Sequence, residues 1–385
     1  MYTKKISAVL IFPLIIAIAW IYSSVALIVQ EGYFWDLGIY LRAVGALNNG
    51  LDPYQLDGYL LFIYHPLVLH VMAIFGQYLN LILIFLYFLS CLFFIYCIPK
   101  KQSYLLPCFL AFSYCGMGWL SLAGGNLTIY LHLVLLGLLM REAVKSQSYY
   151  SFIIFVTIFS LIKPYFLIYL ALPILAQWNS KVLIKKLVKF SGITTLIFVF
   201  FLVFASIQYG DEFNAFTSAL KNQTIGKHDL GFGFVMFFYD YYSSAGNLIY
   251  RAFLIHFALA VIFLLIPFYL ELKKGSANPI TWPLLLYFLL SVFNPRLKDY
   301  DFSPSLIALL IYYFSLKQSL PSLLIFFIAY CASLTQLRDT LFFTHTGFFA
   351  DPKQAYFFSA GLLYIFIIYR LIFPLNEGQV NLLSK

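Results

Sequence analysis

The chain has 385 residues, of which 63% are hydrophobic and 10% are charged. Soluble domains carry about a quarter charged residues, so this composition excludes a soluble globule and predicts an integral membrane protein. The net charge of +9 comes from short Lys and Arg runs between apolar segments, a pattern typical of cytoplasmic membrane loops and not of a nucleic-acid-binding surface.

Uncharged apolar runs recur along the whole chain. They cover 6–30, 58–99, 102–140, 146–162, 164–180, 190–210, 252–270, 275–295, 302–316, 318–337 and 354–369. A helix rises about 1.5 Å per residue and needs roughly 20 residues to cross a bilayer. The runs 58–99 and 102–140 are therefore long enough for two helices each, with breaks near Gly76–Asn80 and Gly124–Asn126. We expect an all-α protein with about 12 transmembrane helices, in which residues 1–385 form one membrane unit.

The segment 31–57 begins where the first apolar run ends, and Asp36 lies at that boundary. Apolar residues then recur at helical spacing and predict a short amphipathic helix on the membrane surface, ended by Gly50 and Pro53. These residues are Leu37, Tyr40, Leu41, Val44 and Leu47. Two explanations of Asp36 stay open: it caps this helix, or it acts as a general base.

Three polar residues interrupt the apolar runs that follow. Lys163 is the one charged residue in 146–180; an ion inside a membrane is a functional-site candidate, although its side chain could also reach the interface. His65 precedes a proline and fits either a phosphate contact or an ordinary backbone hydrogen bond. Asn126 follows two glycines and fits either a substrate contact or a helix cap.

Two later segments contain residue types suited to sugars and phosphates. The segment 211–250 contains Asn222, Gln223 and His228 before an aromatic run, which suits sugar recognition and equally suits interfacial anchoring. The segment 295–301 contains Arg296 and Lys298. These two cations suit a phosphate, or they are neutralised by the neighbouring aspartates in a solvated loop.

The positive-inside rule orients the chain. Lys4 and Lys5, the lysines of 181–189, and the pair at 273–274 are placed in the cytoplasm. Both termini are then cytoplasmic, and the segments 31–57, 211–250 and 295–301 share the outer face.

Two arrangements of residues 58–180 stay open. If 58–76 crosses the membrane fully, the basic residues at 100–101 and 141–145 lie outside, against the rule. If 58–76 is half inserted, both groups lie inside, and Lys163 becomes the outer tip of a short helical hairpin. We favour the second arrangement.

The outer face would thus combine a carboxylate, cations, aromatic rings and amides. A lipid-linked sugar phosphate keeps its tail in the bilayer and its phosphate at the interface. Arg296, Lys298, Lys163 and His65 would bind that phosphate, and Asp36 would take a proton from an acceptor hydroxyl. Direct displacement would invert the anomeric centre.

Several segments, in this order, resemble the polytopic GT-C glycosyltransferases, in particular glycosyltransferase family 87 and its polyprenol-phosphate-mannose-dependent relatives. The stretch from Asp36 to Tyr54 is similar to the family's D…Y..A..AL..G.DPY, and Tyr64–Leu67 is similar to its YPPL, with His65 in place of the first proline. The family's GQ.N, KP…L..P, NQS and sP elements resemble Gly124–Asn126, Lys163–Pro173, Asn222–Thr224 and Asn294–Arg296.

This resemblance implies a GT-C fold with amphipathic helices in its outer loops and Asp36 as catalytic base. It also implies a multi-pass protein of the plasma (inner) membrane, with its site on the periplasmic face. We therefore expect an inverting hexosyltransferase that uses a polyprenyl-phosphate sugar, often mannose, and a lipid or glycan acceptor. The expected sugar or acceptor ligands are Asn222, Gln223, His228, Tyr40 and Asn126. The mannosyl relatives often carry a histidine near the position of Arg296, so the donor sugar stays open.

No metal or other cofactor is expected, and the five cysteines, which form no CxxC pair, predict neither a disulfide framework nor structural zinc. Two alternatives to the transferase are a transporter or flippase of lipid-linked sugars and an O-antigen ligase- or polymerase-like enzyme. A transporter would place its charges near the bilayer midplane and often shows internal repeats. A ligase would rely on a large loop late in the chain.

Overall fold

The computed structural model describes residues 35–55, 62–98, 124–145, 148–223, 234, 249–275, 278–316, 320–333 and 352–373. These residues form helices and no strands, which confirms the all-α prediction for this part of the chain. Four of the described helical segments are long and apolar enough to cross a membrane: Pro66–Cys97, Leu127–Lys145, Lys181–Gln208 and Tyr250–Lys274. The number of about 12 spans stays a prediction, and the predicted first span, 6–30, lies outside the described residues.

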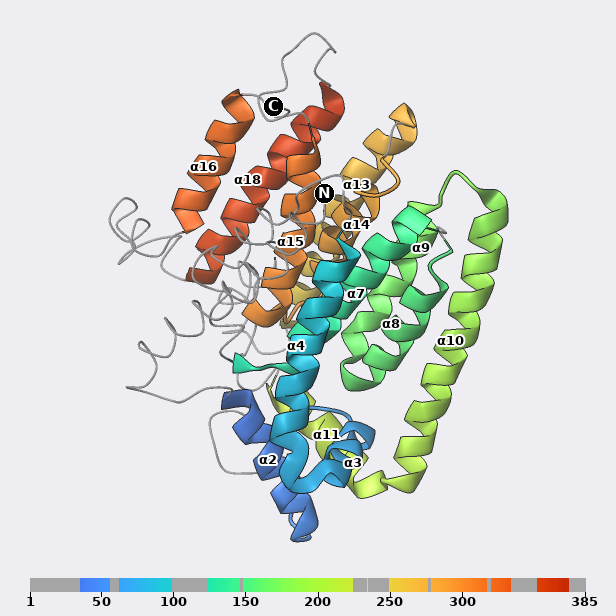
Figure 1. Ribbon diagram of the computed structural model, residues 1–385, viewed down its shortest axis with the longest axis vertical. Helices are drawn as coiled ribbons and strands as arrows, with labels where there is room; N and C mark the ends of the chain where they lie inside the picture. The colour runs from blue at the N-terminus through green and yellow to red at the C-terminus, as the bar shows by residue number, and fades with distance from the viewer. Residues whose placement is uncertain are drawn as a thin grey trace. The chain divides into compact units, whose positions relative to one another are not determined.

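The described helices form two compact units (Figure 1). The first contains α2 (Trp35–Asn48), α3 (Pro66–Phe75), the 3₁₀ helix η1 (Gly76–Tyr78), α4 (Leu79–Cys97), α7 (Leu127–Lys145), α8 (Tyr150–Ile162), the 3₁₀ helix η3 (Pro164–Leu170), α9 (Ala171–Ala176), α10 (Lys181–Gln208) and α11 (Gly210–Lys221). The second contains α13 (Ile249–Lys274), α14 (Trp282–Ser291), α15 (Asp299–Ser315), α16 (Leu320–Ser333) and α18 (Pro352–Ile372).

Glycines interrupt the two long apolar runs where the sequence predicts breaks. Gly76 ends α3 with a φ of 50°, and the chain continues through η1 into α4. Gly125, with a φ of 63°, lies two residues before the start of α7. Positive φ values are accessible to glycine because it has no Cβ, so both breaks follow from the residue type.

Helices α4 and α7 run in the same direction. The ring of Tyr87 on α4 lies 5.2 Å from that of Tyr130 on α7. About two turns further along both helices, Phe93 lies against Gly137. The C-terminal ends of α4 and α7 therefore lie at the same end of the first unit, and the basic residues at 141–145 are found there.

Helix α8 returns antiparallel to α7. At one end the backbone N–H of Ser151 donates to Glu142 at 3.0 Å. At the other end His132, close to the start of α7, lies 3.2 Å from the hydroxyl of Tyr165, just past the end of α8. Lys163 is therefore at the tip of a hairpin formed by α8 with η3 and α9, at the end of the unit where α7 begins.

The hairpin is too short to cross a membrane. Helix α8 has 13 residues and is about 20 Å long, whereas the hydrocarbon core is about 30 Å thick. In Figure 1 the lower end of α8 stops short of the lower end of α10. The structure thus shows a short hairpin with Lys163 at its tip, and the half-inserted arrangement of 58–76 stays a prediction.

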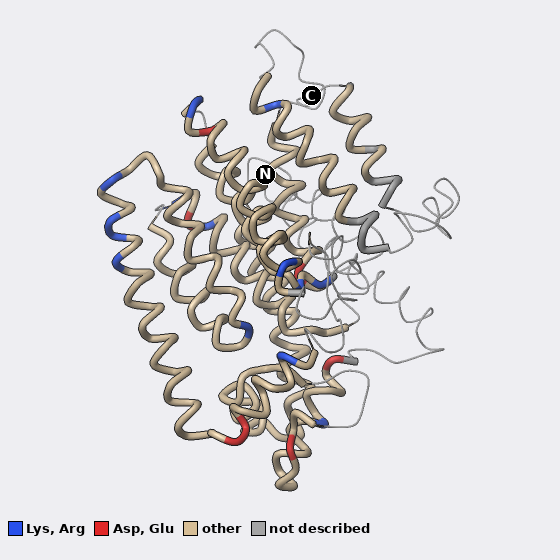
Figure 2. Tube along the Cα trace, turned by 180° about the vertical axis from the view of Figure 1, so that it is seen from behind, with Lys and Arg blue, Asp and Glu red and all other residues tan. Residues whose placement is uncertain are grey.

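The basic residues of α10 gather at its N-terminal end, and the rest of the helix is uncharged (Figure 2). Phe190, in this basic part of α10, packs on Tyr150 at the start of α8, with ring centroids 4.8 Å apart. The lysines of 181–189 therefore lie at the same end of the unit as residues 141–145. The opposite end carries α2, α3 and α11 (Figure 1).

In the second unit, α14 is buried along its whole length, from Trp282 to Ser291. It packs against α13 and α15. The segment 292–298 joins two buried helices, α14 and α15, and carries Arg296 and Lys298.

Candidate functional site

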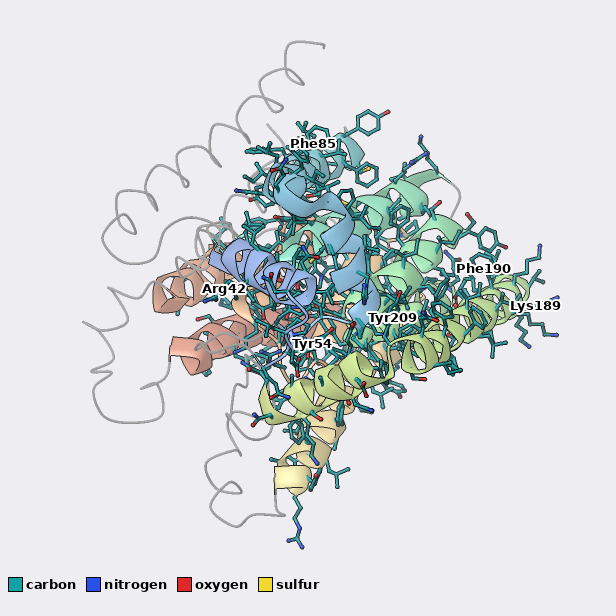
Figure 3. The ribbon with its side chains drawn as sticks, turned by 90° about the horizontal axis from the view of Figure 1, so that it is seen from below. Arg42, Tyr54, Phe85, Lys189, Phe190 and Tyr209 are labelled. Carbon is teal, nitrogen blue, oxygen red and sulfur yellow. The ribbon has the colours of Figure 1, made fainter. Side chains whose placement is uncertain are left out.

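Helix α2 has the amphipathic character that the sequence predicts and places Asp36 and Tyr40 on its buried side. Leu37, Tyr40 and Val44 are buried there. Leu41, expected on the same side, is 38% exposed, and Leu47 is half-buried. The small residues Ala43 and Ala46 are buried in the stripe as well. Arg42, labelled in Figure 3, is exposed on the other side.

Gly50 ends α2, as predicted. It has a φ of 68°, and its backbone N–H donates to Leu47 O at 3.1 Å while the N–H of Leu51 donates to Ala46 O at 2.9 Å. These two bonds form a Schellman motif, which satisfies the last carbonyls of the helix.

The carboxylate of Asp36 bonds to Asn126, the residue just before α7. Its Oδ2 accepts a hydrogen bond from Asn126 Nδ2 at 2.7 Å. Both side chains are buried, with exposed fractions of 8% for Asp36 and 6% for Asn126. Asp36 is in the first turn of α2, where the helix dipole also favours a negative charge.

The amide of Asn126 has one possible orientation. Its Oδ1 accepts from Thr128 N–H at 3.0 Å, from Thr128 Oγ1 at 2.7 Å and from the hydroxyl of Tyr64 at 3.2 Å. The backbone N–H can only donate, and the three bonds together identify this atom as the oxygen. The nitrogen therefore faces Asp36. Because Asn126 Oδ1 also caps the N-terminus of α7, the helix-cap explanation of this residue is confirmed.

A chain of hydroxyl groups leads to Asn126. The hydroxyls of Tyr40 and Tyr64 are 2.9 Å apart, and Tyr40 accepts from the backbone N–H of Leu127 at 3.2 Å. Tyr64 has one hydroxyl proton, which it donates to Asn126, so Tyr40 must donate to Tyr64. Burial raises the pKa of Tyr40 well above its usual value, so its proton is present at neutral pH.

Lys163 joins the same cluster through Tyr64. Its Nζ lies 5.4 Å from the centroid of the Tyr64 ring, within the distance of a cation–π interaction. Tyr54, labelled in Figure 3, also holds Tyr64 in place, because its hydroxyl donates to the backbone oxygen of Tyr64 at 2.9 Å. The carboxylate of Asp36 and the ammonium group of Lys163, from distant parts of the sequence, thus belong to one cluster. We call it the Asp36 cluster, and it consists of Asp36, Tyr40, Tyr64, Asn126, Thr128 and Lys163.

His65 is fully buried and caps α3. Its Nδ1 accepts from the backbone N–H of Leu67 at 3.3 Å, and its ring meets Phe213 and Phe216 of α11, with centroid distances of 5.8 Å. Burial lowers the pKa of His65, which precedes the span beginning at Pro66, from 6.5 to about 4. The helix-cap explanation of His65 is thus seen in the structure, and because Nδ1 accepts, the proton of the neutral ring is on Nε2, which has no hydrogen-bond partner among the described residues. A contact of this Nε2–H with a phosphate stays a prediction.

The predicted ligands of the segment 211–250 are not among the residues of the Asp36 cluster. Asn222 directly follows α11 and is exposed, and the next residue, Gln223, is buried. His228 lies outside the described residues. A polar contact between α3 and α11 was not predicted: His70 Nε2 lies within hydrogen-bond distance of Glu212 Oε2, at 2.8 Å.

Arg296 and Lys298 belong to the second unit, and both are partly exposed. The backbone N–H of Arg296 donates to Asn294 Oδ1 at 3.1 Å, and that of Lys298 donates to Asp301 Oδ2 at 3.3 Å. Asp301 is buried at the N-terminus of α15. The segment has an ordered backbone framework, and its proposed phosphate contact stays a prediction.

Sequence reasoning missed Tyr64 and Thr128 as members of the cluster. A signal for Tyr64 exists, because a tyrosine within an apolar run needs a partner for its hydroxyl. Within the described residues, no group of three or more His, Cys, Asp and Glu side chains could hold a metal ion.

No protein-family model, curated protein or solved structure matches this chain. The likeness to the GT-C enzymes therefore rests on the motifs themselves.

Proposed function

We propose that this membrane protein is an inverting glycosyltransferase. It transfers a hexose from a polyprenyl-phosphate donor to a hydroxyl group of a lipid or glycan acceptor. The observation that carries the proposal is the buried carboxylate of Asp36, held at 2.7 Å by Asn126 in the same cluster as the cation Lys163. Ionisable residues are expensive in a membrane protein and are usually functional.

In the proposed reaction, Asp36 takes the proton of the acceptor hydroxyl. The acceptor oxygen attacks the anomeric carbon, the bond from that carbon to the phosphate oxygen breaks, and the polyprenyl phosphate leaves with the electron pair. A single displacement inverts the anomeric configuration. Lys163 stabilises the charge that the phosphate gains. The phosphate contact predicted for Arg296 and Lys298 from the sequence stays a separate prediction.

The distribution of charge supports a site on the outer face. The lysines of 181–189 and the basic residues of 141–145 lie at the end of the first unit opposite to Asp36. Basic loops face the cytoplasm, so the Asp36 cluster would face the periplasm.

Asp36→Asn is the direct test, because the amide keeps the shape of the side chain and loses the base. A strain lacking the gene shows which glycan is shortened, and plasmids carrying each variant are then compared for restoring it. We expect Asp36→Asn to lose at least about 10²-fold in transfer from a polyprenyl-phosphate hexose in isolated membranes, at unchanged expression. The matched control is Asp211→Asn, an exposed acid in the first turn of α11, which should restore the glycan fully.

Full transfer by the Asp36→Asn variant would exclude the base role. A strain that accumulates lipid-linked sugar on the cytoplasmic face, without loss of transferase activity in isolated membranes, would identify a flippase.

A further inference from the structure

The oxygen and hydroxyl groups around Asp36 bond to one another, which leaves one N–H of Asn126 and one lone pair of Tyr40 for a sugar. The Oδ1 of Asn126 already accepts three hydrogen bonds. The hydroxyl of Tyr40 accepts one from Leu127 and gives its single proton to Tyr64. The sequence predicts both residues as sugar or acceptor ligands, and this geometry gives them another task.

We infer that Asn126 is the positioning residue of Asp36: its fixed amide holds the carboxylate charged and aimed, while Tyr40, Tyr64 and Thr128 hold the amide. This inference rests on the proposed function, in which Asp36 is the base. It differs from the prediction of Asn126 as a sugar ligand, because Asn126 would act through Asp36 without touching the substrate.

The first step of the argument is the cost of turning the amide. A flipped Asn126 would place its NH₂ group against the N–H and hydroxyl of Thr128 and the hydroxyl of Tyr64, and its oxygen against the carboxylate of Asp36. The two hydroxyls can rotate to accept from the NH₂ group, but the contact with the Thr128 N–H and the contact with the Asp36 carboxylate become repulsive. Each unsatisfied buried group costs about 1–3 kcal/mol, so the donor side of the amide faces Asp36 permanently.

The second step concerns the charge. A hydrogen bond from Asn126 Nδ2 stabilises the ionised carboxylate, and a buried carboxylate without such a donor tends to become protonated. The 2.7 Å distance between the two side chains is typical of a charge-assisted bond. A base must be ionised before it can accept a proton, so Asn126 acts on the same property of Asp36 that the chemistry needs.

The third step concerns how the chain delivers Asn126. Gly125, with its φ of 63°, turns the backbone before α7. Asn126 then caps α7 with its oxygen through Thr128 N–H and presents its nitrogen to α2. One side chain therefore ties the start of α7 to the start of α2, and the cap and the positioning role use opposite sides of the same amide.

Asn126→Asp separates these two roles. The carboxylate keeps acceptor oxygens for Thr128 and Tyr64, so the cap survives, but the donor to Asp36 is replaced by a second carboxyl group. Two carboxyl groups this close share one proton. Tyr64→Phe is the matched control, because it removes one of the three donors and leaves the amide held by Thr128.

The test reads the ionisation of Asp36 without any transfer assay. Apolar carbodiimides modify protonated carboxyl groups, so the pH dependence of Asp36 labelling by dicyclohexylcarbodiimide, measured by peptide mass spectrometry on the full-length protein, gives a midpoint. We expect Asn126→Asp to move that midpoint upward by at least about one pH unit, and Tyr64→Phe to move it by less. The acid limb of the pH–rate profile should move in the same direction.

An unchanged labelling midpoint in Asn126→Asp would overturn the positioning role, whatever Asp36→Asn does to transfer. A shifted midpoint with full transfer by Asp36→Asn would show that Asn126 controls the ionisation of Asp36 and would refute the proposed base. The two failures are therefore distinguishable.

Discussion

The contact between α4 and α7 at Gly137 gives a prediction about the scaffold that holds Asn126. A methyl group at this position would lie 2.9 Å from Cε1 of Phe93 and 3.4 Å from the Cα of Phe94. Phe93 is partly exposed, so its ring can turn aside, whereas the backbone of Phe94 cannot. Small residues at helix crossings allow this close approach in membranes.

The expected magnitudes follow from these distances. Gly137→Ala forces the ring of Phe93 off its rotamer, which costs about 0.5–1.5 kcal/mol, while alanine in a helix gains about 1 kcal/mol over glycine. The two nearly cancel. Gly137→Leu adds carbons that reach the backbone of Phe94, and overpacking of this kind costs about 1–3 kcal/mol. The alanine variant should therefore unfold near the wild-type temperature, and the leucine variant clearly below it.

The assay is thermal unfolding of purified protein in detergent, with the double variant Phe93→Ala/Gly137→Leu as a rescue, because residues in contact do not act additively. Gly192→Leu is the control: Gly192 is exposed on α10, and no atom lies within 4 Å of its Cβ position. If Gly137→Leu is as stable as Gly137→Ala, or if Phe93→Ala brings no recovery, the close α4–α7 packing is refuted.

Two further predictions concern His65 and the orientation of the first unit. Burial lowers the pKa of His65 from 6.5 to about 4. Between pH 6.5 and pH 4 the unfolded chain therefore binds a proton at His65 that the folded chain does not bind. The free energy of unfolding thus falls as the pH drops from 6.5 towards 4. His65→Asn keeps a cap acceptor for α3 and should lose less unfolding temperature between pH 7 and pH 4.5 than the wild type; an equal loss would exclude His65 as the cause. Thr217→Cys on α11 and Asn179→Cys before α10 are both exposed. In intact cells a membrane-impermeant maleimide should label the first and not the second, and the reverse result would overturn the proposed sidedness.

The regular parts of the fold could be predicted from sequence because composition and spacing act locally. The helix breaks at Gly76 and Gly125 and the end of α2 at Gly50 follow from single glycines with positive φ. The short hairpin around Lys163 follows from run length and from the placement of basic residues. The division into two units was not predicted, because no change of composition or linker marks it.

The partners within the site could not be predicted in this way. Asn126 bonds to residues 90 and 62 positions away, Asp36 and Tyr64, and such pairs depend on how α2 and α7 pack. An amide after two glycines can serve a sugar, a helix cap or a carboxylate, and the spacing of residues does not distinguish these uses. His65 illustrates the same limit, since its packing against Phe213 and Phe216 joins α3 to α11, which the sequence does not indicate.

The short length of α8 is the feature of the fold that places a cation in the same cluster as Asp36, the proposed base. A longer helix that starts at the same basic end would carry Lys163 beyond the Asp36 cluster. With 13 residues, α8 turns back early and leaves Lys163 above the ring of Tyr64, whose hydroxyl bonds to the amide that holds Asp36. Glycosyl transfer from a lipid phosphate requires a proton to be removed and a negative charge to be stabilised within the length of one sugar. The short hairpin brings residues for both tasks into one cluster, which is why we regard this hairpin as part of the proposed site.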